Sequence, residues 1–349
     1  MREEITRASA DFVATAFVAD FMEEDFAITT ILRYAAPVSG DRQRMPRDLK
    51  TQKATKQKPS IAIVGAGSLA TFLAVALREA GFNITEIITR DSKPSLRKAR
   101  LLAAKVGALA STVRSARLDA ILLWFCVPDR EIRRAASTLA DYLQARAHST
   151  PRVGVRFALH SSGALSSREL DPLRAAGIAI ASAHPLMTFV AGVKPSLSEV
   201  PFAIEGDAAA TRVARQLVRA LGGESFPLSV ARKAAYHAWA TMTSPLLVAF
   251  LVALEEAASI AGLTREDARR KSLPIIMQTL ANYSRLGPAK SFSGPLIRGD
   301  AATVAKHLAV LKKHPAAGEV YRALAQVALR RLPVKNRAEL QHLLHDGTS

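Results

Sequence analysis

The sequence predicts an α/β domain built on a parallel β-sheet, followed by a second domain made only of helices. In the first part, an apolar run at residues 61–64 leads straight into a glycine-rich turn and then into a segment with helical apolar spacing. Beyond residue 227, alternating strands and helices give way to helical segments alone. The order of strand, turn and helix indicates a Rossmann-type parallel sheet domain.

The turn after the first strand reads Gly65-Ala66-Gly67-Ser68-Leu69 and is followed by Ala70. Gly65 permits a sharp bend, Gly67 lets the backbone approach a pyrophosphate, and Ala70 lets the helix pack close to its strand. The phosphates would then lie at the positive end of the helix. These residues predict a dinucleotide site formed by Gly65, Ala66, Gly67, Ser68 and Leu69. The alternative is a strand, turn and helix that bind nothing.

The residues after the second predicted strand, 84–89, bear on which dinucleotide binds. An acidic side chain here favours the free 2′-hydroxyl of NAD, and a basic one favours the 2′-phosphate of NADP. Arg90 comes first after the strand, Ser92 lies nearby, and Asp91 argues the other way. The sequence therefore favours NADP(H) over NAD(H), with Arg90 and Ser92 as contacts. A solvated turn is the alternative.

Three further strands are predicted at residues 120–127, 153–159 and 178–183, and each ends in a short loop. Ligands bind just outside the carboxyl ends of the strands in an open parallel sheet, so these loops should line one crevice. The predicted cofactor contacts there are Val127, Pro128, Asp129, Ser161 and Ser162, and the predicted substrate contacts are Ser162, Gly163 and His184.

Two histidines at these strand ends have structural alternatives. His160 could hold substrate or the nicotinamide ribose, or it could belong to a turn that caps the next helix. His184 precedes Pro185 and could simply stabilise a tight turn. A last strand at residues 202–205 and a helix at 208–221 complete the sheet domain.

The chain is divided into four parts by these patterns. Residues 1–58 form an N-terminal extension that is disordered or peripheral, and residues 59–227 form the sheet domain. Residues 228–335 form an all-helical substrate and dimerisation domain, with helices at 230–262, 265–286, 301–313 and 316–332. Residues 336–349 form a tail that is at most a polar helix. Long alanine and leucine faces on the helices predict a homodimer through this domain.

Composition narrows the class of protein. The formal net charge is +18, but the basic residues are spread over the chain without a groove-reading motif, which makes nucleic-acid binding the weakest hypothesis. An anionic cofactor or substrate explains the charge better. The single cysteine, Cys126, excludes an internal disulfide and reads as a small buried hydrophobe. The histidines show no metal-ligand spacing, so no metal site is predicted.

The longest apolar segment, residues 238–254, bears on membrane association. It is interrupted by Thr241, Thr243, Ser244 and Pro245, which favours a buried core helix over a membrane span. The first 25 residues are acidic and lack the apolar centre of a secretory signal. The sequence therefore predicts a cytoplasmic protein without membrane contact.

Several short motifs occur in the order seen in a bacterial family of Rossmann-like proteins whose C-terminal helical domain has no assigned function. The chain resembles this family from about residue 60 to residue 332. The family is related to pyrroline-5-carboxylate reductase, 6-phosphogluconate dehydrogenase and the β-hydroxyacid dehydrogenases, and is described as NADP-dependent oxidoreductases without an agreed substrate. The motifs are Gly65-Ala66-Gly67, Val127-Pro128-Asp129, His160-Ser161-Ser162-Gly163-Ala164, His184-Pro185-Leu186, Tyr236-His237 and Gly294-Pro295-Leu296-Ile297-Arg298-Gly299-Asp300.

The resemblance implies a C-terminal domain like that of 6-phosphogluconate dehydrogenase, pairing of two chains through it, and roles for two residues. In β-hydroxyacid dehydrogenases a lysine on the corresponding helix transfers the proton, with an amide one turn later. Lys233 matches the lysine, and His237 takes the place of the amide. A histidine there could itself carry the proton. The alternatives are a solvated lysine and a core histidine.

Two departures from the family and two further residues complete the predicted site. Pro245 stands where the family often has asparagine, and Ser293 where it has threonine. Arg298 could clamp a carboxylate or phosphate of the substrate, whereas Asp300 is expected to cap the next helix.

The function predicted from all this is an NADP-dependent oxidoreductase for a small anionic metabolite held between the two domains, with Lys233, His237 and His160 as catalytic candidates. The alternative function is a catalytically silent NADP(H)-binding sensor or scaffold.

Overall fold

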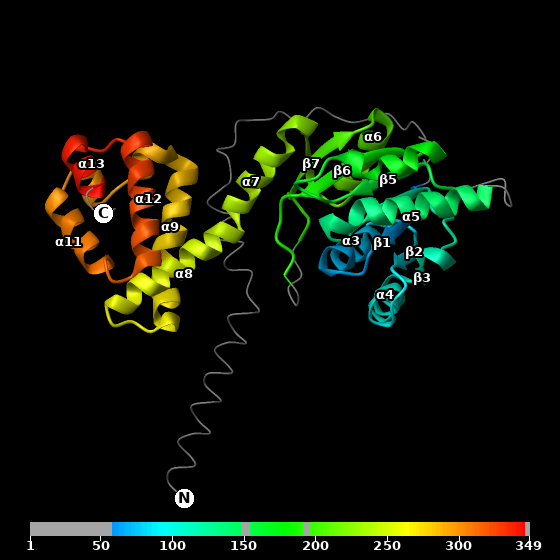
Figure 1. Cartoon of the computed structure of the whole chain (residues 1–349), viewed down its shortest axis with the longest axis horizontal. Helices are drawn as coiled ribbons and strands as arrows, with labels where there is room; N and C mark the ends of the chain where they lie inside the picture. The colour runs from blue at the N-terminus through cyan, green and yellow to red at the C-terminus, as the bar shows by residue number, and fades with distance from the viewer. Residues whose placement is uncertain (1–57, 148–153, 191–195, 346–349) are drawn as a thin grey trace, which may run out of the picture. The chain divides into compact units, whose positions relative to one another are not determined.

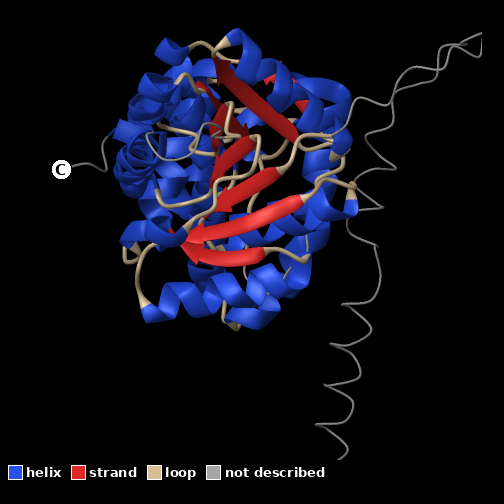
Figure 2. Ribbon diagram, turned by 90° about the vertical axis from the view of Figure 1, so that its right-hand side faces the viewer, coloured by secondary structure: helices blue, strands red, loops and turns tan. Residues whose placement is uncertain are grey.

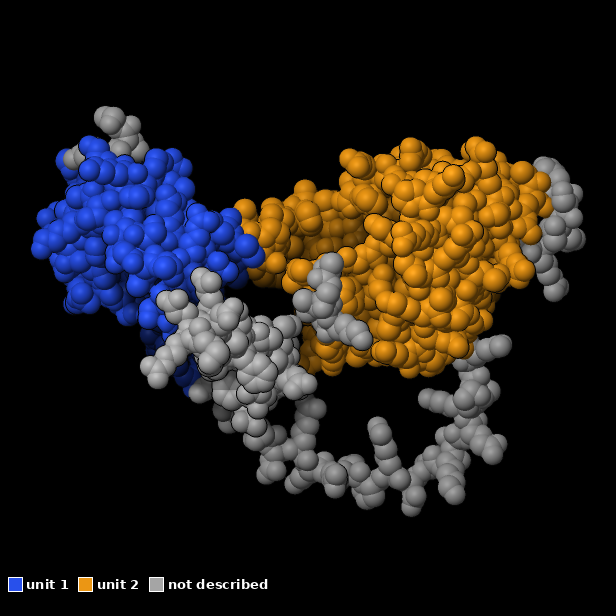
Figure 3. Space-filling view, turned by 90° about the horizontal axis from the view of Figure 1, so that it is seen from below, with its two compact units in different colours: residues 1–49, 247–349 blue, residues 50–246 orange. Residues whose placement is uncertain are grey.

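The computed structural model describes residues 58–147, 154–190 and 196–345. The predicted N-terminal extension therefore lies outside the described residues, apart from its last position. Lys50–Leu246 form one compact unit, here called the sheet unit, and Leu247–Ser349 belong to a second, here called the helical unit (Figure 3). The sheet unit thus continues past the predicted boundary at residue 227 and includes the first helix that follows it.

An eight-stranded sheet forms the centre of the sheet unit (Figures 1 and 2). The strand order is β3-β2-β1-β4-β5-β6-β7-β8, with β7 antiparallel to β6 and all other neighbours parallel. This confirms the predicted fold class. Strands β3 and β8, which are short and contain no buried apolar run, were not expected from the sequence. The strands are β1 (Ile61–Val64), β2 (Ile84–Thr89), β3 (Leu109–Thr112), β4 (Leu122–Phe125), β5 (Phe157–His160), β6 (Ala179–Pro185), β7 (Pro201–Gly206) and β8 (Glu224–Pro227).

Helices cover both faces of the sheet, which explains why its central strands read as continuous apolar runs. In β1, Ile61 and Ile63 pack into the core beneath α3 (Ser68–Glu79), α4 (Lys93–Val106) and α6 (Ala208–Ala220). Ala62 and Val64 point the other way, into a second core beneath α5 (Asp129–Ala147) and the 3₁₀ segment η2 (Ser167–Ala176). Two further 3₁₀ turns, η1 (Val113–Ser115) and η3 (Val230–Arg232), complete the unit.

The helical unit has its own apolar core, built by the helices nearest the C-terminus. Its helices are α8 (Pro245–Ile260), α9 (Arg265–Ser291), α10 (Pro295–Arg298), α11 (Ala301–Leu311), α12 (Pro315–Arg331) and α13 (Arg337–His345), of which α8 starts two residues before the unit boundary. Leu340 and Leu344 on α13 are fully buried in this core beside Val304 of α11. The expectation of a polar tail after residue 335 is therefore wrong. Two leucines four residues apart are the signal for this helix.

The apolar segment predicted as one buried helix is divided and mostly exposed. The helix α7 (Lys233–Thr243) ends at Ser244, whose backbone leaves the helical region, and α8 starts at Pro245. Ala253 is the one buried residue of α8. Met242 is 67% and Val248 60% exposed. By length and composition alone, Val230–Ile260 could cross a membrane, and 6% of its most apolar window is buried. The prediction of a buried core helix is wrong for a single chain.

Candidate functional site

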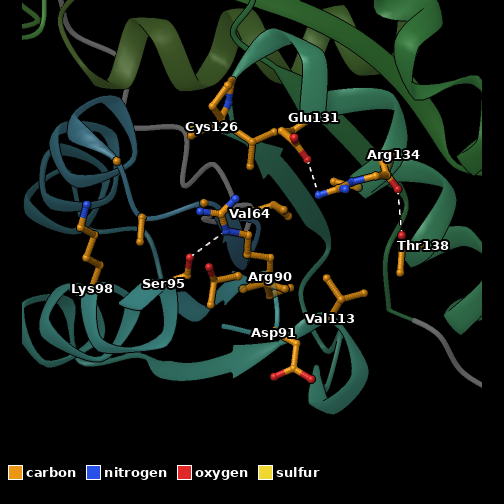
Figure 4. Close-up of a pocket in the computed structure, with 18 of the residues that line it drawn as sticks. Val64, Arg90, Asp91, Ser95, Lys98, Val113, Cys126, Glu131, Arg134 and Thr138 are labelled. Atoms are coloured by element: carbon orange, nitrogen blue, oxygen red, sulfur yellow. Dashed lines mark hydrogen bonds and ion pairs between the residues drawn. The ribbon is translucent and has the colours of Figure 1, made fainter. Parts of the chain in front are cut away.

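A cavity of about 600 Å³ lies at the carboxyl ends of β1, β2 and β4 (Figure 4). Six residues predicted to contact a cofactor line it: Gly65, Ala66, Gly67, Arg90, Val127 and Pro128. Of the three strand-end loops expected to line one crevice, the loop after β4 lines this cavity, together with the turn after β1 and the residues after β2, and the loops after β5 and β6 do not. The loops converge because parallel strands bring their carboxyl ends to one edge of the sheet.

The floor of the cavity is the turn between β1 and α3. Gly65 has a φ of +121°, and a Cβ built on it would lie 2.4 Å from the carbonyl oxygen of Cys126, so only glycine fits. Gly67 begins α3 as its N-cap, and nothing lies within 4 Å of a Cβ built there. The first hydrogen bond of the helix runs from Thr71 N to Gly67 O at 3.0 Å.

The backbone N–H groups of residues 68–70 precede that first helical bond, so they are free of helical partners. Ser68 and Leu69, both predicted cofactor contacts, do not line the cavity with their side chains. Their backbone N–H groups nevertheless lie at the positive end of α3, where an anion is favoured. The turn therefore fits a pyrophosphate, with open space over Gly67 for the phosphate oxygens.

The rim of the cavity is basic. Arg90 leaves the end of β2 and donates from Nε to Ser95 Oγ at 3.0 Å, which fixes the direction of its guanidinium (Figure 4). Ser92, a predicted contact, is instead the N-cap of α4 and accepts from Ser95 N. The basic side chains that line the cavity are Arg90, Lys98, Arg114, Arg130 and Arg134, against the acidic Asp91 and Glu131.

Four of these cations were missed by sequence reasoning. Lys98 comes from α4 and Arg114 from η1. The segment η1 directly follows β3, a strand that the sequence did not predict. Arg130 and Arg134 occupy successive turns at the start of α5, a spacing that was visible in the sequence. Arg134 is held by an ion pair with Glu131 at 2.5 Å (Figure 4).

The loops after β4 and β5 are joined by buried hydroxyls. Trp124 Nε1 donates to Ser161 Oγ at 2.8 Å, and Ser162 Oγ donates to Asp129 Oδ2 at 2.8 Å. Ser162 Oγ also accepts from Leu165 N at 2.9 Å. Ser161, Ser162 and Asp129 do not line the cavity, and Ser161 and Ser162 are buried. These bonds hold the two loops together at the same edge of the sheet. The three residues therefore support the loops without lining the cavity.

His160 has both ring nitrogens occupied. Nδ1 accepts from Ser162 N at 3.1 Å, so Nε2 carries the proton and donates to Ser166 O at 3.0 Å. The side chain is fully buried, and burial together with the nearby Lys233 charge lowers its pKa to about 3. A neutral imidazole with no free nitrogen holds the loop after β5 in place. The catalytic role of His160 stays a prediction, and in this structure both of its ring nitrogens are bonded to backbone.

Lys233 is also saturated. Its Nζ donates to Ser182 Oγ at 2.6 Å and to Ser162 O at 3.0 Å, and lies 3.5 Å from Glu205 Oε1. An ammonium group has three N–H donors, and three acceptors surround this one. Burial lowers the pKa of Lys233, and the Glu205 carboxylate opposes that shift.

Two partners of Lys233, Glu205 and Ser182, were not anticipated. Glu205 is a buried acid at the end of an apolar strand, and a buried carboxylate requires a partner, which is the signal that could have found it. Ser167 N and Ser167 Oγ also donate to Glu205, at 2.7 and 2.8 Å. The predicted catalytic lysine thus lies in a closed polar network that ties α7 to β6, β7 and the loop after β5.

A second group of polar side chains lies at the ends of β5 and β6. His184 Nδ1 is 2.7 Å from Tyr236 Oη, and the His184 and His237 rings meet edge to face with centroids 6.1 Å apart. Gly163 lies against both rings, since a Cβ built on it would be 2.5 Å from His237 Cδ2 and 2.8 Å from His184 Nε2. The structure therefore brings together three predicted site residues, Gly163, His184 and His237, and adds Tyr236.

The remaining predicted residues lie in the helical unit. Arg298 is exposed at the end of α10. Asp300 caps α11, accepting from Thr303 N at 3.0 Å and from Thr303 Oγ1 at 2.7 Å, as expected from the sequence. The role of Arg298 as a clamp on a substrate stays a prediction.

No curated protein matches the chain, but a protein family and several solved structures do. Residues 200–328 match the family described as Domain of unknown function (DUF2520). A candidate NADP oxidoreductase from Bacteroides fragilis is 23% identical with a TM-score of 0.62, over 79% of this chain and 99% of its own.

Two structures solved with a dinucleotide show the same fold at lower identity. A pyrroline carboxylate reductase from Plasmodium falciparum with NADP bound is 12% identical over 84% of this chain and 99% of its own, with a TM-score of 0.51. A reductive aminase from Aspergillus terreus, in complex with NADPH and ethyl levulinate, is 18% identical over 82% and 99%, with a TM-score of 0.53. Residues 200–328 are therefore similar to the family described as DUF2520, and about four-fifths of the chain shares the Rossmann-type fold of these solved structures.

Proposed function

We propose that the protein is an NADP(H)-dependent oxidoreductase that acts on a small, anionic metabolite in the cytoplasm. The observation that carries this proposal is the cavity floored by Gly65 and Gly67 at the start of α3 and rimmed by Arg90. The shape of the cavity floor and the positive end of the α3 helix dipole suit a pyrophosphate, and the basic rim suits a further phosphate. Relatives of the same fold that were solved with NADP or NADPH support the choice of cofactor class.

The charge around the cavity favours NADP(H) over NAD(H). Five basic and two acidic side chains line it, a balance of +3. The two cofactors differ by the 2′-phosphate, which would lie beside the residues that follow β2. Arg90 occupies that position, and its bond to Ser95 leaves the rest of the guanidinium free for two-pronged contact with phosphate oxygens.

The chain's own residues then have separate tasks. The bound dihydronicotinamide supplies a hydride, and the protein must hold the acceptor carbon near it and move one proton. The turn at residues 65–67 and the basic rim bind the adenosine and pyrophosphate portions. The bonded loops after β4 and β5 fix the sheet edge at which the nicotinamide portion would lie, because the strands stand in the order β2, β1, β4, β5 along the sheet.

Binding of the two cofactors tests the proposal. NADPH is expected to bind at least ten times more tightly than NADH, and Arg90→Ser is expected to weaken NADPH binding by about 10- to 100-fold, the loss of one charge-assisted contact. NADH binding should change little in that variant. Isothermal titration with both cofactors measures these values.

Arg156→Ser is the matched control for Arg90→Ser. Arg156 lies just before β5, at the amino end of the sheet, and stacks over Phe157 outside the cavity. This substitution should leave both affinities unchanged. If neither cofactor binds to the unmodified protein below millimolar concentration, the proposed function is wrong.

A sensor or scaffold that binds NADP(H) without turnover is the second candidate, and one observation favours it. Lys233, the residue in the position of the family's proton-transfer lysine, has its three donors occupied. A screen of hydroxy acids with NADP⁺, and of cyclic imines with NADPH, separates the candidates. Tight NADPH binding without turnover of any compound, and no effect of His237→Ala on binding, would favour the sensor.

We further propose that two chains pair through the helical unit. Large apolar side chains are exposed along α8 and α9, and a stable dimer needs about 800 Å² of such surface from each partner. The most exposed of them are Val248 (60%), Val252 (58%), Ile275 (68%) and Tyr283 (58%).

Sedimentation velocity tests this pairing. The unmodified protein is expected to sediment as a dimer at micromolar concentration. Ile275→Asp should weaken dimerisation at least tenfold, because an unpaired charge would be buried. The control is Leu101→Asp on α4 in the sheet unit, which is 60% exposed and should leave the dimer intact. A monomer at all concentrations would contradict the proposed pairing.

A further inference from the structure

The group of side chains at the ends of β5 and β6 is suited to deliver a proton. This proton-delivery cluster comprises His184 on β6, Tyr236 and His237 on α7, and Gly163 in the loop after β5. Tyr236 Oη lies 2.7 Å from His184 Nδ1, with the two rings edge to face at 5.5 Å. The absence of a side chain at Gly163 leaves room for the rings of His184 and His237 side by side.

The cluster lies at the sheet edge where the cofactor cavity opens. The order β1, β4, β5, β6 places the end of β6 three strands from the Gly65 turn, or about 14 Å at the usual strand spacing. The bond between Ser162 Oγ and Asp129 Oδ2 ties the loop next to Gly163 to the loop that borders the cavity. The nicotinamide end of an extended dinucleotide bound across β1 and β4 would therefore point towards the cluster.

The other buried titratable groups nearby are already committed. Lys233 is saturated by Ser162, Ser182 and Glu205, and Glu205 is shared between Lys233 and Ser167. His160 has both nitrogens bonded to backbone. Asp129 accepts the Ser162 hydroxyl. Tyr236 is 7% exposed, and its Oη is bonded to His184 Nδ1. When Nδ1 donates that bond, the Tyr236 hydroxyl keeps its own proton for a ligand at this edge.

We propose that Tyr236 is the proton donor of the reaction, with His184 as the positioning residue that returns a proton to it. This inference rests on the proposed NADP(H)-dependent function. As hydride adds to the carbon of a C=O or C=N bond, the electron pair of the broken π bond takes the Tyr236 proton onto oxygen or nitrogen. The tyrosinate recovers a proton from His184 Nδ1, while His184 Nε2 takes one from water and leaves hydroxide. Hydride, proton and charge then balance.

The protonation states suit this order of steps. Burial raises the pKa of Tyr236 to about 12, so the hydroxyl stays protonated until it meets a stronger base such as a nascent alkoxide or amide anion. Burial, with the charges of Lys233 and His237, lowers the pKa of His184 to about 4. The His184 ring is therefore neutral near pH 7 and can pass a proton through without storing one. Lys233, held nearby, is a second positioning residue.

The chain contains a matched control pair. In the helical unit, Tyr321 Oη lies 3.0 Å from His307 Nδ1, with the rings edge to face at 5.8 Å. This pair joins α12 to α11 and has the same chemistry as the pair of Tyr236 and His184, without the adjoining strand ends. Any effect that comes only from breaking a tyrosine–histidine bond should appear equally in Tyr321→Phe.

The first test is NMR of protein that is isotopically labelled at its eight histidines. The ring resonance of each histidine is assigned by substituting that residue. On addition of NADPH, the ring signals of His184 and His237 are expected to shift, and that of His307 to stay. NADPH binding that leaves both His184 and His237 unmoved would overturn the inference while the proposed function stands. No NADPH binding at all would instead overturn the proposed function.

The second test is Tyr236→Phe with a panel of 2-oxo acids and cyclic imines as probes. The kcat on any reduced probe is expected to fall by at least about 100-fold, the usual contribution of a general acid, with the NADPH Kd changed less than twofold. Tyr321→Phe should leave kcat and Kd unchanged. A kcat retained in Tyr236→Phe would show that the hydroxyl is not the donor. If no probe is reduced, the histidine spectra decide the inference.

Discussion

Lys233→Met is expected to lower the free energy of unfolding by about 3 kcal/mol, the usual cost of breaking a buried ion pair. The methionine removes the cation and leaves the Glu205 carboxylate, whose side chain is 4% exposed, without its counter-charge. It also leaves Ser182 Oγ and Ser162 O without a donor. Urea unfolding followed by tryptophan fluorescence measures the change, because Trp124 is buried in the sheet and becomes exposed on unfolding.

Two further variants separate charge from packing in this experiment. Adding Glu205→Gln to Lys233→Met should recover part of the lost stability, because no unpaired charge then remains in the interior. Lys105→Met, on the exposed surface of α4, should change stability by less than about 0.5 kcal/mol. If Lys233→Met is as stable as the unmodified protein yet inactive, the lysine is a catalytic group and the positioning role is wrong.

Gly67→Ala is expected to weaken NADPH binding by about 100-fold without changing the urea midpoint. The new Cβ meets no protein atom within 4 Å, so the fold tolerates it. It would project into the space that the pyrophosphate needs and would displace about two charge-assisted hydrogen bonds to backbone N–H groups. Titration with NADPH and a urea unfolding curve for the same preparation give both values.

Gly65→Ala provides the contrast at the neighbouring glycine. There the Cβ would lie 2.4 Å from Cys126 O, and φ is +121°, so the β1 turn or β4 must shift. This variant should lose stability by several kcal/mol and cofactor binding together. If Gly67→Ala binds NADPH normally, the pyrophosphate does not lie against this turn.

Much of the sheet unit could be predicted from local patterns. The apolar runs of β1, β2 and β4 and the small residues at 65, 67 and 70 report burial and backbone shape, which depend on the residue itself and its immediate neighbours. The cofactor loops followed from those strands, because parallel strands end at a common edge. The short strands β3 and β8 lack that pattern, and for this reason they and Arg114 were missed.

The exposed face of α8 shows the limit of reading burial from apolar content. The sequence from 238 to 254 is apolar enough for a core helix, and a single chain leaves most of α8 uncovered. Apolar content predicts that a surface is buried, but it does not indicate whether the same chain or a second chain buries it. The opposite error occurred at α13: its segment is polar overall and was not expected to be buried, yet two of its leucines complete the core of the helical unit.

The sequence by itself determined the fold class, the nucleotide turn and the cationic end of β2, because strand burial, glycine geometry and charge are properties of short stretches of chain. Only the tertiary structure decided which polar groups remain free to react. Lys233 meets acceptors 71 and 51 residues away, and Tyr236 meets His184 across 52 residues. A donor used in an internal hydrogen bond is unavailable to a ligand, as for Lys233, whereas Tyr236 Oη accepts from His184 Nδ1 in the proposed step and keeps its own proton. Which donors are used in this way depends on partners that the fold alone brings together.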